Sequence, residues 1–228
     1  MTELTDAQWR RIPPFVPRPA KTGRPRADDR QTLNGVLWVL RSGARWQEVP
    51  RQYGSPTTGW RRLVTWQTSG VWTRLWQALW KSLDAQDRLR WRQAFLEGSL
   101  VPAKGGRGVG VSRRGKGTQC TLVVERQGIP LAAPLASAQD HDVRWAQPTL
   151  AWVRVPQRRG RPRTRVPPLT ADQGYDSRAV RQWWRAQGTA SGMPLRASTP
   201  RRRVGRRPAT PRHLARQRWR VERRFAWL

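Results

Sequence analysis

The charge of this chain constrains its fold more than any other feature of its sequence. Lys and Arg number 45 against 14 Asp and Glu, which gives a formal net charge of +31 over 228 residues. Self-repulsion at this level opposes a compact state. A polyanion relieves it, because Arg and Lys that neutralise phosphates release condensed counterions. We therefore expect a nucleic-acid-binding protein with steep salt dependence, rather than a basic surface that is merely solvated.

Apolar residues are numerous enough to form a core in spite of this charge. They make up 37% of the chain and include 15 Trp, a composition that argues against a disordered basic tail. The length suits one large domain or two small ones. No apolar run approaches the roughly 18–20 residues that span a bilayer, and the N-terminus lacks a signal-peptide pattern. We expect no membrane partner and a cytoplasmic, nucleoid-associated location in a prokaryotic cell.

Cysteine and histidine are too scarce to build a metal site. Cys120 is the only cysteine, and His141 and His213 are the only histidines. This excludes an internal disulfide framework and a thiolate zinc site of finger or ribbon type. A metal in this chain must therefore bind to carboxylates.

Residues 1–90 have the apolar spacing of a small helical bundle, which we expect to be a DNA-binding domain. One helix is expected after Pro25, with Asp28 and Asp29 at its start and Gly43 at its end. Another is expected over residues 72–83, where Trp and Leu recur every three or four residues and indicate a packing face rather than a base-stacking platform.

Between these two, a helix that ends at Gly70 is a candidate recognition helix. Its apolar stripe is expected to contain Trp60, Leu63, Val64 and Gln67. Arg61 and Arg62 lie beside this stripe and are candidate DNA contacts. The connection after Leu40 is longer than the usual three or four residues of a helix-turn-helix, so that interpretation and an ordinary bundle both remain open.

Residues 91–228 have the pattern of a sheet with flanking helices. Strands are expected at 95–101, 118–124, 130–135, 168–172 and 193–197, and helices at about 143–153, 177–187 and 211–228. The order βββαβαβα predicts a mixed α+β or α/β domain, with a crossover between the third and fourth strands.

Two basic, proline-rich loops interrupt this domain, at 157–166 and 200–208. The first contains Arg159-Gly160-Arg161-Pro162, which resembles the AT-hook core that lays an extended Arg-Gly-Arg in a narrow minor groove. The alternative is a generic phosphate-contacting loop. In either case Arg159 and Arg161 are candidate DNA contacts.

Only seven acidic residues follow residue 90. They are Glu97, Glu125, Asp140, Asp142, Asp172, Asp176 and Glu222. Mg²⁺ takes oxygen ligands, and a two-metal nuclease needs about three converging carboxylates. Any such site must draw on this set.

Several segments carry a resemblance to a known family. They are Leu96-Glu97-Gly98-Ser99, Gly115-Lys116-Gly117-Thr118, the run 171–177 (ADQGYDS) and the run 218–228 (RWRVERRFAWL), with 4–9, 23–26 and 43–46 in the N-terminal part. Together they resemble the DDE transposases of the IS5 and IS4 type of insertion sequence. The resemblance covers nearly the whole chain.

The resemblance implies an RNase H-like catalytic domain over 91–228, incomplete at its C-terminus, after a helical DNA-binding domain over 1–90. It implies a DNA transposase that cuts element ends with Mg²⁺ or Mn²⁺ and joins the freed 3′-OH to target DNA. Glu97, Asp172 and Glu222 would be the catalytic metal ligands. Lys116 and Arg218 would contact DNA. The partner would be double-stranded DNA, as terminal inverted repeats and target, with a homodimer on DNA left open.

Two departures from the family pattern support an alternative. Glu97 stands where the family has Asp, and its extra methylene displaces the carboxylate. The chain also ends at Leu228, before residues that members usually carry. The alternative is a catalytically defective remnant that only binds DNA; a basic RNA-binding protein of ribosomal type is a further one.

The remaining acids have ordinary structural interpretations. Glu125 is expected to be a turn or solubility residue. Asp140 and Asp142 precede the crossover helix and are expected to cap it, and Asp176 is expected to cap the next helix.

Overall fold

The computed structural model describes residues 3–20, 22–23, 25–106, 108–113, 115–157 and 159–188. These residues form two compact units, and the division between them falls after Leu79. Within the described residues, no helix has both the length and the apolar character needed to cross a membrane.

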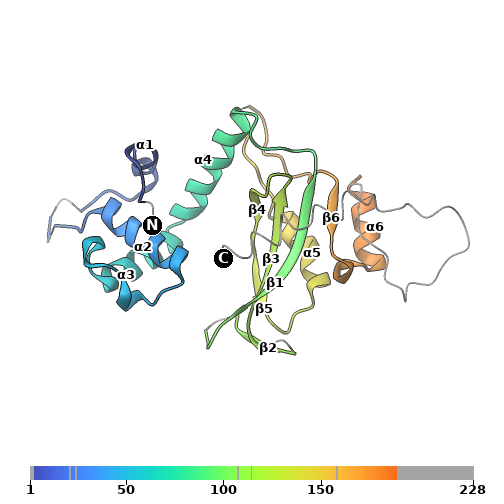
Figure 1. Cartoon of the computed structure of the whole chain (residues 1–228). Coiled ribbons are helices and arrows are strands. Elements are labelled where there is room, and N and C mark those ends of the chain that lie inside the picture. Colours follow the sequence, from blue (N-terminus) through green and yellow to red (C-terminus); the bar gives the residue numbers. More distant parts are fainter. Residues whose placement is uncertain are drawn as a thin grey trace, which may run out of the picture. The chain divides into compact units, whose positions relative to one another are not determined.

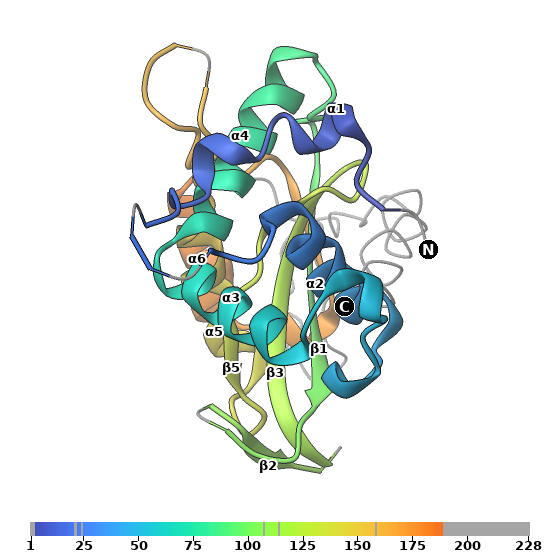
Figure 2. The ribbon, with the colours of Figure 1, turned by 90° about the vertical axis from the view of Figure 1, so that its left-hand side faces the viewer.

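The first unit is helical, as the sequence predicts (Figures 1 and 2). Its elements are α1 (Asp6–Trp9), η1 (Pro13–Phe15), α2 (Asp29–Ser42), η2 (Trp46–Glu48), η3 (Arg51–Tyr53), α3 (Pro56–Thr68) and the first part of α4 (Val71–Ala85). The expected limits of α2 are confirmed. Asp28 accepts a 2.6 Å hydrogen bond from the Gln31 amide, and Gly43 ends the helix at φ +66°.

The core of this unit contains Leu33, Trp66 and Val71, and the rings of Trp66 and Trp72 meet edge to face at 5.6 Å. The short elements α1 and η1 add partly buried apolar side chains to the same cluster. The core therefore joins α2, α3 and α4 to the N-terminal segment.

The apolar stripe predicted for α3 is wrong. Trp60 is 51% exposed and Val64 41% exposed, whereas Gly59 and Trp66 are buried. The reason is a close approach at Gly59, where an added Cβ would lie 3.1 Å from the Trp46 ring. This approach turns Gly59 inward and leaves Trp60 outward, where its ring meets Trp46 at 5.6 Å.

The connection between α2 and α3 is not the short turn of a compact helix-turn-helix. Residues 43–55 contain the two short helices η2 and η3. Gly35 of α2 allows η3 to pack closely, because an added Cβ would lie 2.9 Å from the Tyr53 Cβ. A recognition role for α3 therefore depends on its exposed face and not on this motif.

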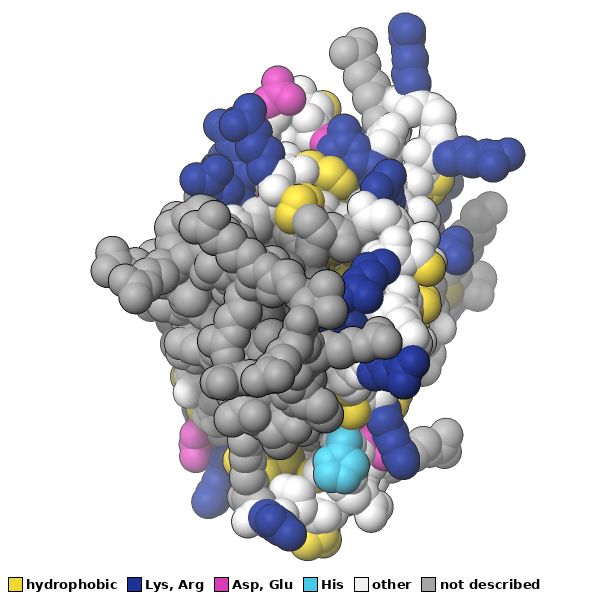
Figure 3. All heavy atoms as spheres, turned by 90° about the vertical axis from the view of Figure 1, so that its right-hand side faces the viewer, with side chains coloured by type: hydrophobic (Ala, Val, Ile, Leu, Met, Phe, Trp, Pro, Cys, Tyr) yellow, Lys and Arg dark blue, Asp and Glu magenta, His cyan; other side chains and the backbone are white. Residues whose placement is uncertain are grey.

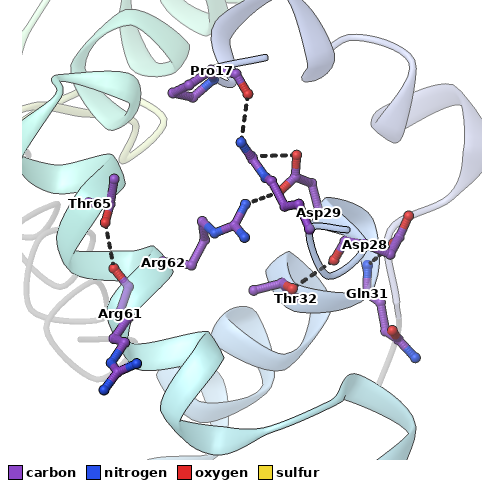
Figure 4. A network of polar contacts seen from close by, with 9 residues as sticks. Pro17, Asp28, Asp29, Gln31, Thr32, Arg61, Arg62 and Thr65 are labelled. Atoms are coloured by element: carbon purple, nitrogen blue, oxygen red, sulfur yellow. Dashed lines mark hydrogen bonds and ion pairs between the residues drawn. The ribbon is translucent and has the colours of Figure 1, made fainter. Parts of the chain in front are cut away.

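An ion-pair network joins the start of α2 to α3 (Figure 4). Arg26 donates to both carboxylate oxygens of Asp29 at 2.6 Å, and Arg62 of α3 pairs with the same carboxylate. The Arg62 guanidinium also lies 5.8 Å from the Trp66 ring centre. Burial, and then the neighbouring Arg26, lowers the pKa of Arg62. Arg61 points away from this network and is exposed.

The second unit is built on a six-stranded mixed sheet. Its strands are β1 (Ala94–Pro102), β2 (Gly110–Ser112), β3 (Gly115–Glu125), β4 (Pro130–Ala132), β5 (Leu135–Ser137) and β6 (Leu169–Ala171). The order is β2-β3-β1-β6, and β4 and β5 pair with the rest of β3. Every pairing is antiparallel except that of β1 with β6, which is parallel.

This arrangement confirms the RNase H-like topology. A meander of antiparallel strands is followed by the crossover helix α5 (Asp142–Ala151), and β6 then returns parallel to β1. The short helix η4 (Gln173–Tyr175) and the helix α6 (Arg178–Ala186) follow. The expected strand at 193–197 and helix at 211–228 lie outside the described residues.

Two details of the sheet differ from the sequence prediction. The third expected strand is divided into β4 and β5, with Pro134, which has no N–H to donate, between them. The short β2 was not predicted; it pairs with the start of β3 through a tight turn at which Gly115 has φ +116°.

The two faces of the sheet have separate cores. On one face, Leu96 and Val123 pack with Ala146 and Leu150 of α5 and with Trp184 of α6. On the other, Phe95, Leu122 and Val124 form a second buried cluster. Because successive side chains of a strand point to opposite faces, Glu97 shares the face of Phe95, and Gly98 shares the face covered by α5.

Arg62→Ala is expected to lower the free energy of unfolding of the helical unit by about 2 kcal/mol. The substitution leaves Asp29 half-buried with one partner instead of two and removes the guanidinium from Trp66. Urea denaturation followed by Trp fluorescence measures the effect. Arg61→Ala, which removes the same charge from the exposed neighbour, is the matched control. Equal stabilities of the two variants would contradict a structural role for Arg62.

Candidate active site

The parallel pairing of β1 and β6 brings two predicted metal ligands together. Leu96 of β1 is the register partner of Ala171, the last residue of β6. Glu97 on β1 and Asp172, directly after the end of β6, are therefore the next residues along two neighbouring chain segments, and paired strands lie about 5 Å apart. Both residues are half-buried, and the Glu97 Oε2 atom is shielded from solvent. The sequence prediction that these two carboxylates lie close together is supported by this register.

Three polar side chains converge behind Glu97, on the α5 face of the sheet. An added Cβ on Gly98 would lie 2.7 Å from Gln119 Nε2, 2.8 Å from Asp142 Oδ1 and 2.8 Å from the Tyr175 hydroxyl. The Gln119 side chain donates a 2.6 Å hydrogen bond to Asp142. Strand β3, helix α5 and helix η4 each supply one of these groups. We call Gln119, Asp142 and Tyr175 the polar triad.

Tyr175 is the most deeply buried member of the triad, with 1% of its surface exposed. Burial raises the pKa of its hydroxyl, and the negative charges of Asp142 and then Glu97 raise it further. The phenol therefore remains protonated across the physiological range. Its amide donates a 3.0 Å hydrogen bond to the Asp172 carbonyl, which closes the turn after β6.

The sequence did not predict this triad. Tyr175 belongs to the segment 171–177. The sequence alone does not show whether its side chain packs in the core or lies at the site, because that depends on which residues surround it in the fold. Gln119 lies in a strand and has no distinctive spacing. The one available signal was Gly98 inside an otherwise apolar strand, a position that often marks a close approach.

The carboxylates on β1 and β6 suit a hard divalent cation. Mg²⁺ is commonly held by one or two protein carboxylates together with substrate phosphates, so Glu97 and Asp172 have the right donor chemistry. Among the described residues, no group of three or more Asp, Glu, His or Cys is assembled that could hold a metal on its own. Glu222, the third predicted ligand, and Arg218 lie outside the described residues.

The four remaining acids after residue 90, Glu125, Asp140, Asp142 and Asp176, were expected to have turn, solubility or helix-capping roles, and the structure agrees with only some of these. Glu125 is fully buried and accepts hydrogen bonds from the amides of Arg90, Gln127 and Ile129, so the turn role is confirmed and the solubility role is wrong. Asp140 accepts a 3.3 Å hydrogen bond from the Trp145 indole.

The predicted helix caps are also wrong. The N-cap position of α5 is His141, without a side-chain cap, and Asp142 bonds to Gln119 instead of a helix amide. Ser177 caps α6, and the buried Asp176 accepts a 2.5 Å hydrogen bond from Arg181. Asp142 is instead bound by Gln119 of β3, and Asp176 by Arg181 of α6 itself.

Some of the predicted DNA contacts are exposed, and one forms an ion pair within the protein. Arg61 is exposed on α3, and Lys116 is exposed near the turn between β2 and β3. Lys116 is the residue before Gly117, which pairs with Pro102 at the end of β1. Pro102 is five residues after Glu97, so roughly 17 Å of strand separates Glu97 from this end of β1. Arg62 is engaged with Asp29. Among the described side chains in Figure 3, Lys and Arg are widespread and Asp and Glu are few.

The basic loop after α5 has a defined base. Val155 and Arg163 exchange two backbone hydrogen bonds of 2.8 and 3.0 Å, which close residues 156–162 into a projecting loop (Figure 2). Arg163 also pairs with Asp84 at 3.1 Å and lies 5.6 Å from the Trp91 ring centre. Arg159 and Arg161 are exposed at the tip.

The tip of this loop is not extended as an AT-hook core would be. Gly160 has φ +85°, which turns the chain between the two arginines. The geometry favours the alternative of a phosphate-contacting loop.

Gly98→Ala is expected to destabilise the second unit by about 1–3 kcal/mol, because the new methyl group would overlap all three members of the polar triad. Gly105→Ala is the control, since an added Cβ there has no neighbour within 4 Å. Thermal unfolding measures both variants. A Gly98→Ala protein as stable as the Gly105→Ala protein would show that the triad is not packed against β1.

Two family models match this chain. Residues 4–76 match the DUF4096 family model, which describes transposases of the IS4/5 family, and residues 88–228 match the model of the transposase DDE domain. A 16.2 kDa protein of insertion element IS402 from Burkholderia cepacia is 37% identical over 109 residues, which are 45% of this chain and 74% of that protein.

Two further proteins are similar to this chain. Protein y4sN of Sinorhizobium fredii is 37% identical over 84 residues, which are 36% of this chain and 67% of that protein. A chain in the crystal structure of the Mos1 strand transfer complex is 12% identical, with a TM-score of 0.29, and the match covers 77% of this chain and 60% of that one. The DDE model alone spans more than half of the present sequence. This chain therefore belongs to the family of transposases that carry a DDE domain.

Proposed function

We propose that this chain is a DNA transposase that binds the ends of its insertion element and catalyses metal-dependent strand cleavage and strand transfer. The observation that carries the proposal is the register of β1 with β6, which makes Glu97 and Asp172 neighbours within a DDE domain. The order of elements around this pair supports the same interpretation.

Glu97 and Asp172, with Glu222, are the proposed ligands of Mg²⁺ or Mn²⁺. The cation would lower the pKa of a water and offset the negative charge that develops at the attacked phosphate. The chain itself holds the two carboxylates at adjacent strand positions. Burial of Glu97 Oε2 limits competition from water at that carboxylate.

DNA is the proposed polyanion, held by exposed basic residues on both units. Arg61 on α3, Lys116 at the hairpin and the pair Arg159 and Arg161 at the loop tip are the proposed phosphate contacts. Arg218 remains a proposal from the family pattern. The DNA would include the terminal inverted repeats and the target, with 1–90 as the end-binding domain and 91–228 as the catalytic domain.

A DNA-binding remnant without cutting activity is the second candidate, and one observation favours it. Glu97 carries one methylene more than the family's Asp, and catalytic groups must be held within about 0.5 Å. Glu97→Asp separates the two candidates. A remnant should gain cleavage from this change, whereas a competent transposase should change little.

Asp172→Ala is expected to abolish nicking of DNA that carries the element's terminal repeats in Mg²⁺ or Mn²⁺, because one of two adjacent ligands is lost. Binding of the same DNA without metal should be unchanged. The control is Asp140→Ala, which removes an acid outside the β1 and β6 pair. Gel assays of cleavage and of binding measure the two effects, and full nicking by Asp172→Ala would refute the catalytic assignment.

The double variant Arg159→Ala with Arg161→Ala is expected to weaken binding to duplex DNA equally for all sequences. The plot of log K against log salt has a negative slope, and its magnitude should decrease by about 2, since each phosphate contact contributes about 0.9. Arg10→Ala with Arg11→Ala removes the same charge from exposed residues of α1 and its C-terminal end. Fluorescence anisotropy over a salt series compares them. Identical slopes for the two double variants would argue against a loop contact.

A further inference from the structure

We propose that Asp142 is a positioning residue of the metal site, and that it acts through the polar triad to fix Glu97 and Asp172 relative to one another. This inference rests on the proposed function, because it assigns a role around the same two ligands. Neither the family pattern quoted above nor the helix-cap interpretation gives Asp142 this role.

The triad fixes the first ligand through the residue that follows it. Gln119, Asp142 and Tyr175 all approach the Cα of Gly98 so closely that a Cβ there would lie within 2.8 Å of each. Gly98 is bonded to Glu97, and β1 is held in register by β3 on its other side. The backbone at Glu97 therefore cannot shift toward α5 without displacing the triad.

The same groups fix the second ligand. An added Cβ on Gly174 would lie 3.8 Å from Asp142 Oδ2 and equally 3.8 Å from Asp172 Oδ2. Asp142 thus uses one oxygen beside Gly98 and Gln119, and directs the other toward the turn that carries Asp172. Tyr175 is the third residue after Asp172 and closes that turn through its amide.

The electrostatics agree with a positioning role. Asp142 and Glu97 both raise the pKa of the Tyr175 hydroxyl, so negative charge from α5 and from β1 reaches the same buried phenol. The buried phenol lies against Gly98, the neighbour of Glu97, and the Tyr175 amide closes the turn after Asp172. Outer groups of this kind commonly contribute 10–100-fold to metal affinity or activity.

The test measures Mn²⁺ binding to the full chain by electron paramagnetic resonance, with the specific site defined as the signal that Asp172→Ala removes. Asp142→Asn keeps an acceptor for Gln119 but loses the charge, and Tyr175→Phe loses only the hydroxyl. Each is expected to raise the Kd for Mn²⁺ about 10–100-fold. Asp140→Asn, two residues away in the same segment, should bind like the parent chain.

Thermal unfolding distinguishes a loss of positioning from a loss of folding, and DNA cleavage distinguishes a failure of this inference from a failure of the proposed function. Thermal unfolding should show that every variant is folded at the assay temperature, so a lost metal site is not a lost fold. Parent-like Mn²⁺ affinity in Asp142→Asn and Tyr175→Phe, or no specific Mn²⁺ signal in the parent chain, would overturn the inference.

DNA cleavage is then measured on the same proteins. If the parent binds Mn²⁺ and the variants bind it weakly, positioning is supported even when no protein cuts DNA, and only the proposed function fails. If all proteins cut DNA and the variants bind Mn²⁺ like the parent, the function stands and the positioning role is wrong.

Discussion

The parallel pairing of β1 with β6 is the constraint on which the candidate site depends. Three register pairs, from Ala94 with Leu169 to Leu96 with Ala171, end where the two acids begin. A slip of one residue would turn Glu97 to the α5 face and exchange it with Gly98. The buried cluster beneath Leu96 and the triad beneath Gly98 both oppose that slip. Core packing and site geometry therefore specify the same register.

Acidic side chains and surplus basic side chains have different surroundings in the two units. The few acids are paired or deeply hydrogen-bonded: Asp29 holds two arginines, Asp176 holds Arg181, and Asp84 holds Arg163. Two of these pairs, Asp29 with Arg62 and Asp84 with Arg163, join segments that are distant in sequence. The surplus cations are exposed, where a polyanion can reach them. This division explains why adjacent residues such as Arg61 and Arg62 have unrelated roles.

Helices and strands could be predicted from the sequence because their signals are local. Asp28 and Gly43 mark the limits of α2, and short strand-like runs between Gly-rich or turn-forming segments mark β1 and β3. The orientation of α3 was not predictable, because it depends on the contact of Gly59 with Trp46 across the unit. The adjacency of Glu97 and Asp172 followed from the family pattern. The roles of Asp142 and Asp176 did not, because side-chain partners, Gln119 on β3 and Arg181 within α6, replaced the caps that sequence position suggests.

The most direct test of a metal site between β1 and β6 is local backbone cleavage by bound Fe²⁺. Fe²⁺ takes the place of Mg²⁺ in the full chain, and hydroxyl radicals generated at the ion cut the nearest peptide bonds, which mass spectrometry then locates. We expect cuts beside Glu97 and beside Asp172 that excess Mg²⁺ suppresses. Cuts confined to other acidic residues, such as Glu48 or Asp84, or cuts that Mg²⁺ does not suppress, would contradict a metal site between β1 and β6.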